Sequence, residues 1–238
     1  MTAQYQPIRV WSRKIRLFHW LNLLCVLLLM VIGLMLLNGK LLGLSADGKI
    51  LLKTFHVITG YVFALNLVFR LVLGFLGKGY ERWGKTLPFN PGYRRELLAF
   101  RQNKHLVYKG HNPAGKLMVA ALLFFMSVQM LTGLVLAGTD IYYPPFGTYV
   151  AAYIAEDSDK LDEIKPYSKV NVNAQAYREM RALRKPVVTV HVYSFYTLVV
   201  LIVFHILGVI IAERREKTAL VSAMINGYKY LPPDKQKK

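Results

Sequence analysis

The stretch that decides the fold is residues 187–212, which reads VVTVHVYSFYTLVVLIVFHILGVIIA and contains no charged side chain. As a helix, an apolar run of this length crosses the ~30 Å hydrocarbon layer of a bilayer. It carries two histidines, His191 and His205, which are fourteen residues apart. Fourteen residues make almost four whole helical turns. Both imidazoles therefore leave the same side of the helix, separated by roughly 21 Å along its axis.

Three more runs of this kind precede it. The chain has 238 residues, of which 54% are hydrophobic, and the further apolar runs cover residues 17–37, 50–76 and 117–137. Each is long enough to span a membrane, and none has the charge density of a soluble amphipathic helix. We therefore predict an all-α integral membrane four-helix bundle that forms a single domain over residues 1–238.

The distribution of charge predicts the orientation of these helices. The net charge is +18, from 31 basic and 13 acidic residues. The two ends of the chain and the loop 77–116 together carry 20 basic and 5 acidic residues, whereas the first loop with Lys53 and the loop 138–186 carry 10 and 8. The positive-inside rule predicts cytoplasmic N and C termini, a cytoplasmic loop 77–116 and a periplasmic loop 138–186. Topology and anionic lipid explain the basic charge, so we predict no nucleic-acid partner.

Four histidines lie within the predicted spans, and their depths match in pairs. Because consecutive spans run in opposite directions, His19 and His205 lie near the cytoplasmic side, and His56 and His191 lie near the outer side. A crossed pair such as His19 with His191 is separated by roughly 20 Å in depth. A single buried histidine is usually a hydrogen-bonded core residue, but four matched in depth favour two ligand pairs. The two remaining histidines, His105 and His111, fall in the loop 77–116 and are not predicted to be ligands.

Paired imidazoles in an apolar bundle suit a haem iron that transfers electrons, since filling both axial positions leaves no open site for oxygen or substrate. Zinc or copper sites normally add Cys, Asp or Glu ligands. The only cysteine, Cys25, is interpreted as a small buried hydrophobe. We therefore predict two haem groups with bis-histidine ligation, with His19, His56, His191 and His205 as the iron ligands.

Other intramembrane residues suit a flat, acidic ligand. Gly33 and Gly60 are predicted to leave space beside it, because neither has a side chain. Arg70 lies fourteen residues after His56, at the cytoplasmic side of its span. We interpret it either as a counter-charge for the carboxylates of the inner haem or as a snorkelling arginine. Gln129 and Thr132 either line a quinone pocket or form ordinary interhelical hydrogen bonds.

The sequence resembles the prokaryotic cytochrome b561 family, and within it the di-haem b-type subunits that anchor nickel–iron hydrogenases. The likeness extends from about residue 10 to residue 229. Besides His191 and His205, it is carried by the segments RLFHW (16–20), FHVITGY (55–61) and GHNP (110–113). The resemblance implies two haem b groups ligated by His19, His56, His191 and His205, and electron exchange between a periplasmic redox partner and the membrane quinone pool.

The resulting expectation is an inner-membrane cytochrome with a periplasmic dehydrogenase, hydrogenase or c-type cytochrome as partner, and quinone as its probable substrate. Arg70 and Arg16 are predicted to bind the inner haem propionates. For the propionates of the outer haem, the candidate partners are Lys53, Arg184 and Lys185. Two alternatives stay open: a stand-alone quinone-coupled oxidoreductase that acts on a small oxidant or radical, and a haem-free anchor or transporter with a proton relay. Assembly as a homodimer within a larger complex also stays open.

Overall fold

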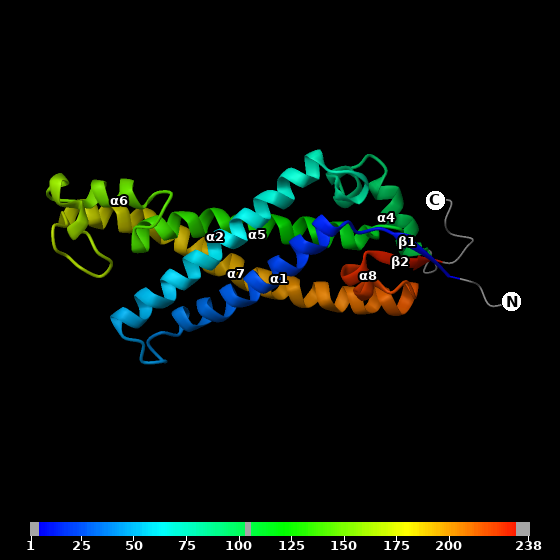
Figure 1. The fold of residues 1–238 in the computed structure, drawn as a ribbon, viewed down its shortest axis with the longest axis horizontal. Coiled ribbons are helices and arrows are strands. Elements are labelled where there is room, and N and C mark those ends of the chain that lie inside the picture. Colours follow the sequence, from blue (N-terminus) through cyan, green and yellow to red (C-terminus); the bar gives the residue numbers. More distant parts are fainter. Residues whose placement is uncertain (1–4, 103–105, 232–238) are drawn as a thin grey trace. The chain divides into compact units, whose positions relative to one another are not determined.

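The structure is a computed structural model that describes residues 5–102 and 106–231, so His105 lies outside the described residues. Helices dominate the described chain (Figure 1). The elements are β1 Gln6–Arg9, α1 Arg13–Leu37, α2 Ala46–Leu76, the 3-10 helix η1 Gly79–Glu81, α3 Trp83–Thr86, α4 Tyr93–Gln102, α5 Pro113–Ile141, α6 Gly147–Ile154, the 3-10 helix η2 Ser158–Glu163, α7 Ala174–Glu216, α8 Leu220–Asn226 and β2 Tyr228–Leu231.

Helices α1, α2, α5 and α7 are each long and apolar enough to cross a membrane. Each contains one of the four predicted apolar runs and extends beyond it at one or both ends. The prediction of an all-α protein with four candidate membrane spans is therefore confirmed. The cytoplasmic placement of the termini stays a prediction.

The last span differs from its prediction at the N-terminal end. We expected the outer loop to reach Pro186, but α7 is continuous from Ala174 to Glu216 with Pro186 inside. A proline removes one backbone hydrogen bond from a helix. The preceding sequence, Ala174–Lys185, is rich in Ala, Arg, Met and Leu, which favour helix. Packing of Met180 against Ile154 of α6 further holds this first part of α7.

The chain divides into two compact units, and each long helix contributes residues to both. One unit comprises Met1–Leu21, Asn66–Phe125 and Leu198–Lys238, and contains His19 and His205. The other comprises Asn22–Leu65 and Met126–Thr197, and contains His56 and His191. We call them the inner unit and the outer unit, after their predicted sides of the membrane.

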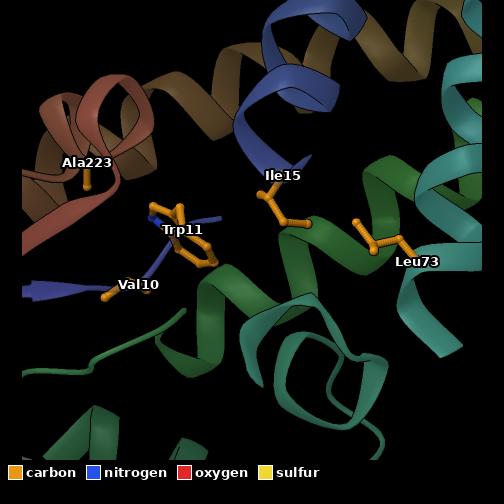
Figure 2. Packing of buried hydrophobic residues seen from close by; sticks show 5 residues of the cluster. All are labelled: Val10, Trp11, Ile15, Leu73 and Ala223. Atoms are coloured by element: carbon orange, nitrogen blue, oxygen red, sulfur yellow. The ribbon is translucent and has the colours of Figure 1, made fainter. Parts of the chain in front are cut away.

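The inner unit has a hydrophobic core where the N-terminal segment meets the C-terminal one. Figure 2 shows its buried residues, which are Val10, Trp11, Ile15, Leu73 and Ala223. Beside this core, β1 and β2 form an antiparallel pair with Gln6 opposite Leu231. The backbone N–H of Val10 donates to the carbonyl of Gly227, 2.9 Å away. Both ends of the described chain are thus joined in one small structure.

A buried lysine joins the C-terminal strand to the loop before α5. Lys229 is 2% exposed, and its Nζ donates to the carbonyl oxygens of Tyr108 and Gly110 at 3.0 and 2.9 Å. Burial lowers the pKa of the Lys229 ammonium to about 8, and the nearby Glu216 opposes this effect. The two carbonyls satisfy part of the hydrogen-bonding capacity of a group that is costly to bury.

The outer unit contains a small folded segment between α5 and α7. Its core consists of Ala151, Ile154, Ile164 and Met180. The side chain of Asn171 donates to the carbonyls of Asp157 and Lys160, both at 2.9 Å, and so closes the loop. The predicted outer loop is therefore an ordered structure with its own apolar core.

Candidate functional site

The outer unit brings His56 of α2 and His191 of α7 face to edge. Their ring centroids are 6.4 Å apart and the ring planes make an angle of 71°. An imidazole nitrogen binds a transition metal at about 2 Å and lies ~1 Å from its ring centre, so two opposed imidazoles on one metal have centres about 6 Å apart. The separation of His56 and His191 therefore fits an iron with two axial imidazoles.

Helix α5 supports His191 at two points. The Thr132 hydroxyl oxygen lies 2.8 Å from His191 Nδ1. The side-chain amide of Gln129, one turn earlier, donates to the carbonyl oxygen of His191 at 2.9 Å. Both are interhelical hydrogen bonds, which is one of the two interpretations that we took from the sequence. In contrast, Nδ1 of His56 is buried and has no hydrogen-bond partner in the described chain.

Glycines lie beside both outer imidazoles. A Cβ atom added at Gly33 meets His56 Cε1 at 3.5 Å, and one added at Gly133 meets His191 Cε1 at 3.6 Å. Around Gly60, one turn after His56, an added Cβ meets no atom within 4 Å. Gly33 and Gly133 thus each adjoin one imidazole of the pair, and the role of Gly33 and Gly60 beside a planar group stays a prediction. Sequence reasoning did not select Gly133, although its position directly after Thr132 was a usable signal.

The predicted outer cations meet a carboxylate that sequence reasoning missed. Asp140 of α5 accepts salt bridges from Lys53 Nζ at 2.5 Å and from Arg184 at 2.8 Å. Lys53 Nζ also donates to the Tyr167 hydroxyl at 2.8 Å. Lys185 is exposed. Two of the three predicted cations are thus brought together, and Asp140 is their shared partner.

The inner unit contains His19 of α1 and His205 of α7, near enough for an electrostatic interaction between their rings. His19 Nδ1 is buried without a hydrogen-bond partner among the described residues. The ring of Trp20 packs edge-on against that of His19, with centroids 5.4 Å apart. Asn66 is buried and donates to the carbonyl of Phe18 at 3.1 Å, which ties α2 to α1 beside His19.

Two arginines of the inner unit are held by neutral groups. Arg70 is 3% exposed, donates to the Glu81 carbonyl at 3.1 Å, and stacks on the Trp83 ring at 4.3 Å. Gly74 permits this packing, because a Cβ there meets the Trp83 ring at 1.8 Å. Arg16 donates to the carbonyl of Ile225, while its buried Nε has no partner. Within the described residues neither guanidinium forms a salt bridge, so both charges remain suited to an acidic ligand.

His111 belongs to neither pair. Its ring packs on Trp11, with centroids 4.7 Å apart. Burial lowers the pKa of His111 to about 3, with smaller contributions from the positive charges of Lys229, Arg70 and Lys116 and from the ring of His205. His111 is therefore neutral at physiological pH. His111 thus packs in the loop before α5, and its exclusion from the ligand set stays a prediction.

The protein is thus an integral membrane protein whose two units each contain one histidine pair. A model of the prokaryotic cytochrome b561 family matches residues 10–227, and the chain belongs to this family. The family implies a b-type haem and electron transfer within the membrane. Four candidate spans and this membership identify a multi-pass protein of the bacterial inner membrane.

Several curated proteins are similar over long stretches. One is the probable Ni/Fe-hydrogenase 1 B-type cytochrome subunit of Escherichia coli K12, 29% identical over 161 residues. That match covers 62% of this chain and 66%, or slightly less than two thirds, of the relative. The probable Ni/Fe-hydrogenase B-type cytochrome subunits of Cupriavidus necator and Bradyrhizobium diazoefficiens are 21% and 22% identical, each over 92% of this chain and over 86% and 85% of their own lengths. No solved structure matches.

Proposed function

We propose that this chain is a di-haem cytochrome b that carries electrons across the bacterial inner membrane, between a periplasmic redox partner and the quinone pool. The observation that carries the proposal is the 6.4 Å separation of the His56 and His191 rings, which suits one iron between them. Family membership supports the haem type. His19 and His205 are the proposed ligands of the second haem.

When bound, each haem supplies an iron that accepts and releases one electron. The four imidazoles would hold the two groups in place as ligands of their irons. Gly33, Gly60 and Gly133 leave space for the outer macrocycle. In the inner unit, Arg70 and Arg16 are the proposed partners of the haem propionates, and Lys53 and Arg184 have this role in the outer unit. Such cations offset the cost of placing carboxylates at low dielectric.

A catalytic hydrogenase subunit is the proposed redox partner, because the curated relatives are named as cytochrome subunits of such enzymes. The small folded segment of the outer unit is then the surface nearest that partner, if the predicted orientation holds. Co-purification of the chain from its native membrane tests this assignment. Recovery of a dehydrogenase or of a c-type cytochrome in place of a hydrogenase overturns the choice of partner and leaves the haems unaffected.

Haem stoichiometry tests the ligand assignment. The full-length chain is expected to contain two haems by pyridine haemochrome assay, and His56→Ala, His191→Ala, His19→Ala and His205→Ala are each expected to lose one. His111→Ala is the matched control, and it should retain both. Two haems per chain in any of the four ligand variants reject that histidine as a ligand. A colourless wild-type protein rejects the whole proposal.

The orientation of the chain in the membrane needs a separate measurement. Labelling of introduced thiols is simple here, because the sequence has a single cysteine, Cys25, to replace first. In a Cys25→Ala background, Glu163→Cys and Lys85→Cys place one thiol in each of the two long loops. A membrane-impermeant maleimide added to spheroplasts is expected to label the thiol at position 163 and to leave that at position 85 unlabelled. The reverse pattern contradicts the predicted topology.

A further inference from the structure

The hydrogen bond between Thr132 and His191 has a defined direction. The Thr132 hydroxyl lies 2.6 Å from the carbonyl oxygen of Val128, one turn earlier in α5, and 2.8 Å from His191 Nδ1. A hydroxyl has a single hydrogen, and a carbonyl oxygen can only accept. Thr132 therefore donates to Val128 and accepts a hydrogen bond from Nδ1–H of His191.

This direction selects one tautomer of His191. With its hydrogen on Nδ1, the neutral imidazole keeps a lone pair on Nε2, which is the form that binds a metal through Nε2. Gln129 simultaneously holds the backbone of His191 through the carbonyl hydrogen bond at 2.9 Å. The ring and the backbone of one histidine are thus both fixed by the same face of α5.

We propose that Thr132 is a positioning residue that sets the tautomer and ring orientation of His191, and that its hydrogen bond lowers the reduction potential of the outer haem. The inference rests on the proposed function, since it requires a haem ligated by His191. An acceptor at Nδ1–H makes an imidazole a stronger donor to its metal. Stronger donation favours the ferric state, so loss of the hydroxyl makes the haem easier to reduce.

The test compares hydroxyl-bearing and hydroxyl-free variants of the haem-loaded, full-length protein by potentiometric titration. Thr132→Val removes the hydroxyl at nearly constant volume, Thr132→Ala removes it with less bulk, and Thr132→Ser keeps it. Thr139→Val is the matched control, because Thr139 also lies in α5 and donates to the carbonyl four residues earlier, at 2.9 Å. This hydrogen bond of Thr139 goes to Val135 within α5 and involves no histidine.

Thr132→Val and Thr132→Ala are expected to keep both haems and to raise one of the two midpoint potentials. The expected change is up to about tenfold in the one-electron equilibrium constant, or ~59 mV. Thr132→Ser and Thr139→Val should match the wild type. The low-temperature electron paramagnetic resonance signal of the same haem should shift in the two hydroxyl-free variants, because the ring is free to turn.

These experiments distinguish a failure of the proposed role of Thr132 from a failure of the proposed function. If the wild type has two haems, one of which is lost in His191→Ala, but every Thr132 variant keeps both potentials and spectra, the role of Thr132 is wrong and the cytochrome assignment stands. If His191→Ala loses no haem, the proposed function fails at its ligand, and the role of Thr132 fails with it. A fall in potential in the hydroxyl-free variants also overturns the inference.

Discussion

The inner and outer units differ in what holds their histidines. In the outer unit the support comes from a neighbouring long helix, since α5 supplies Thr132 and Gln129 to His191. In the inner unit the His19 ring packs against Trp20 of its own helix. Segments outside the long helices hold the two arginines instead: Arg70 stacks on Trp83, and Arg16 donates to the carbonyl of Ile225. A substitution near His56 or His191 should therefore act on the outer haem alone, whereas loss of the Arg70 or Arg16 contacts should act on the inner one.

The largest effect is expected from substitutions that place a bulky side chain beside the outer imidazoles. Gly33→Leu and Gly133→Leu are each expected to remove the outer haem and keep the inner one, because a branched side chain then occupies the region next to His56 or His191. Pyridine haemochrome should give a ratio near one haem per chain. Val31→Leu is the control, since Val31 lies in the same helix as Gly33 and is 59% exposed.

The second-largest effect is expected from replacing Asp140, the shared partner of two cations in the outer unit. Asp140→Asn leaves Lys53 and Arg184 without their shared carboxylate, and should lower the free energy of unfolding by about 1–2 kcal/mol. Thermal denaturation in detergent, followed at the Soret band of each haem, should show earlier loss of the outer haem. Lys160→Ala removes an ion pair whose side chains are 59% and 44% exposed, so its effect should stay below ~0.5 kcal/mol. Equal effects of the two substitutions contradict this account.

Arg70 tests the inner unit. Arg70→Gln removes a buried positive charge, which favours the ferric state and should lower one midpoint potential by about 59 mV, equivalent to tenfold in the equilibrium constant. Arg70→Lys keeps the charge and should change the potential less. Redox titration of both variants should leave the outer haem unchanged. A shift of the other potential instead contradicts the placement of Arg70 beside the inner haem.

The smallest expected effect concerns Lys229 and pH. Its pKa is lowered by burial from 10.5 to about 8 in the folded chain, so above pH 8 the unfolded chain binds more protons at this residue. Stability should therefore rise with pH in this window, by about 1 kcal/mol between pH 8 and pH 9. Lys229→Met should remove this part of the pH dependence. The measurement is the thermal midpoint of both proteins at pH 8 and pH 9. If the midpoint of Lys229→Met changes with pH as much as that of the wild type, the assignment is wrong.

The four spans and the two histidine pairs could be predicted from the sequence, because both depend on local regularities. Hydrophobic length marks a membrane helix, and helical rise converts the fourteen-residue spacing of His191 and His205 into a depth difference. For the outer pair, the structure confirms that His56 and His191 approach each other at 6.4 Å. The predicted iron ligation itself waits for the haem assay.

Only the tertiary structure decided which side chains meet across helices. The pairing of Thr132 with His191, and of Asp140 with both Lys53 and Arg184, depends on how each helix is rotated about its own axis. Hydrophobic periodicity leaves that rotation open in a membrane protein, because lipid and the bundle interior are both apolar. Likewise, the continuation of α7 through Pro186 depended on the packing of Met180, a contact between segments that are distant in the sequence.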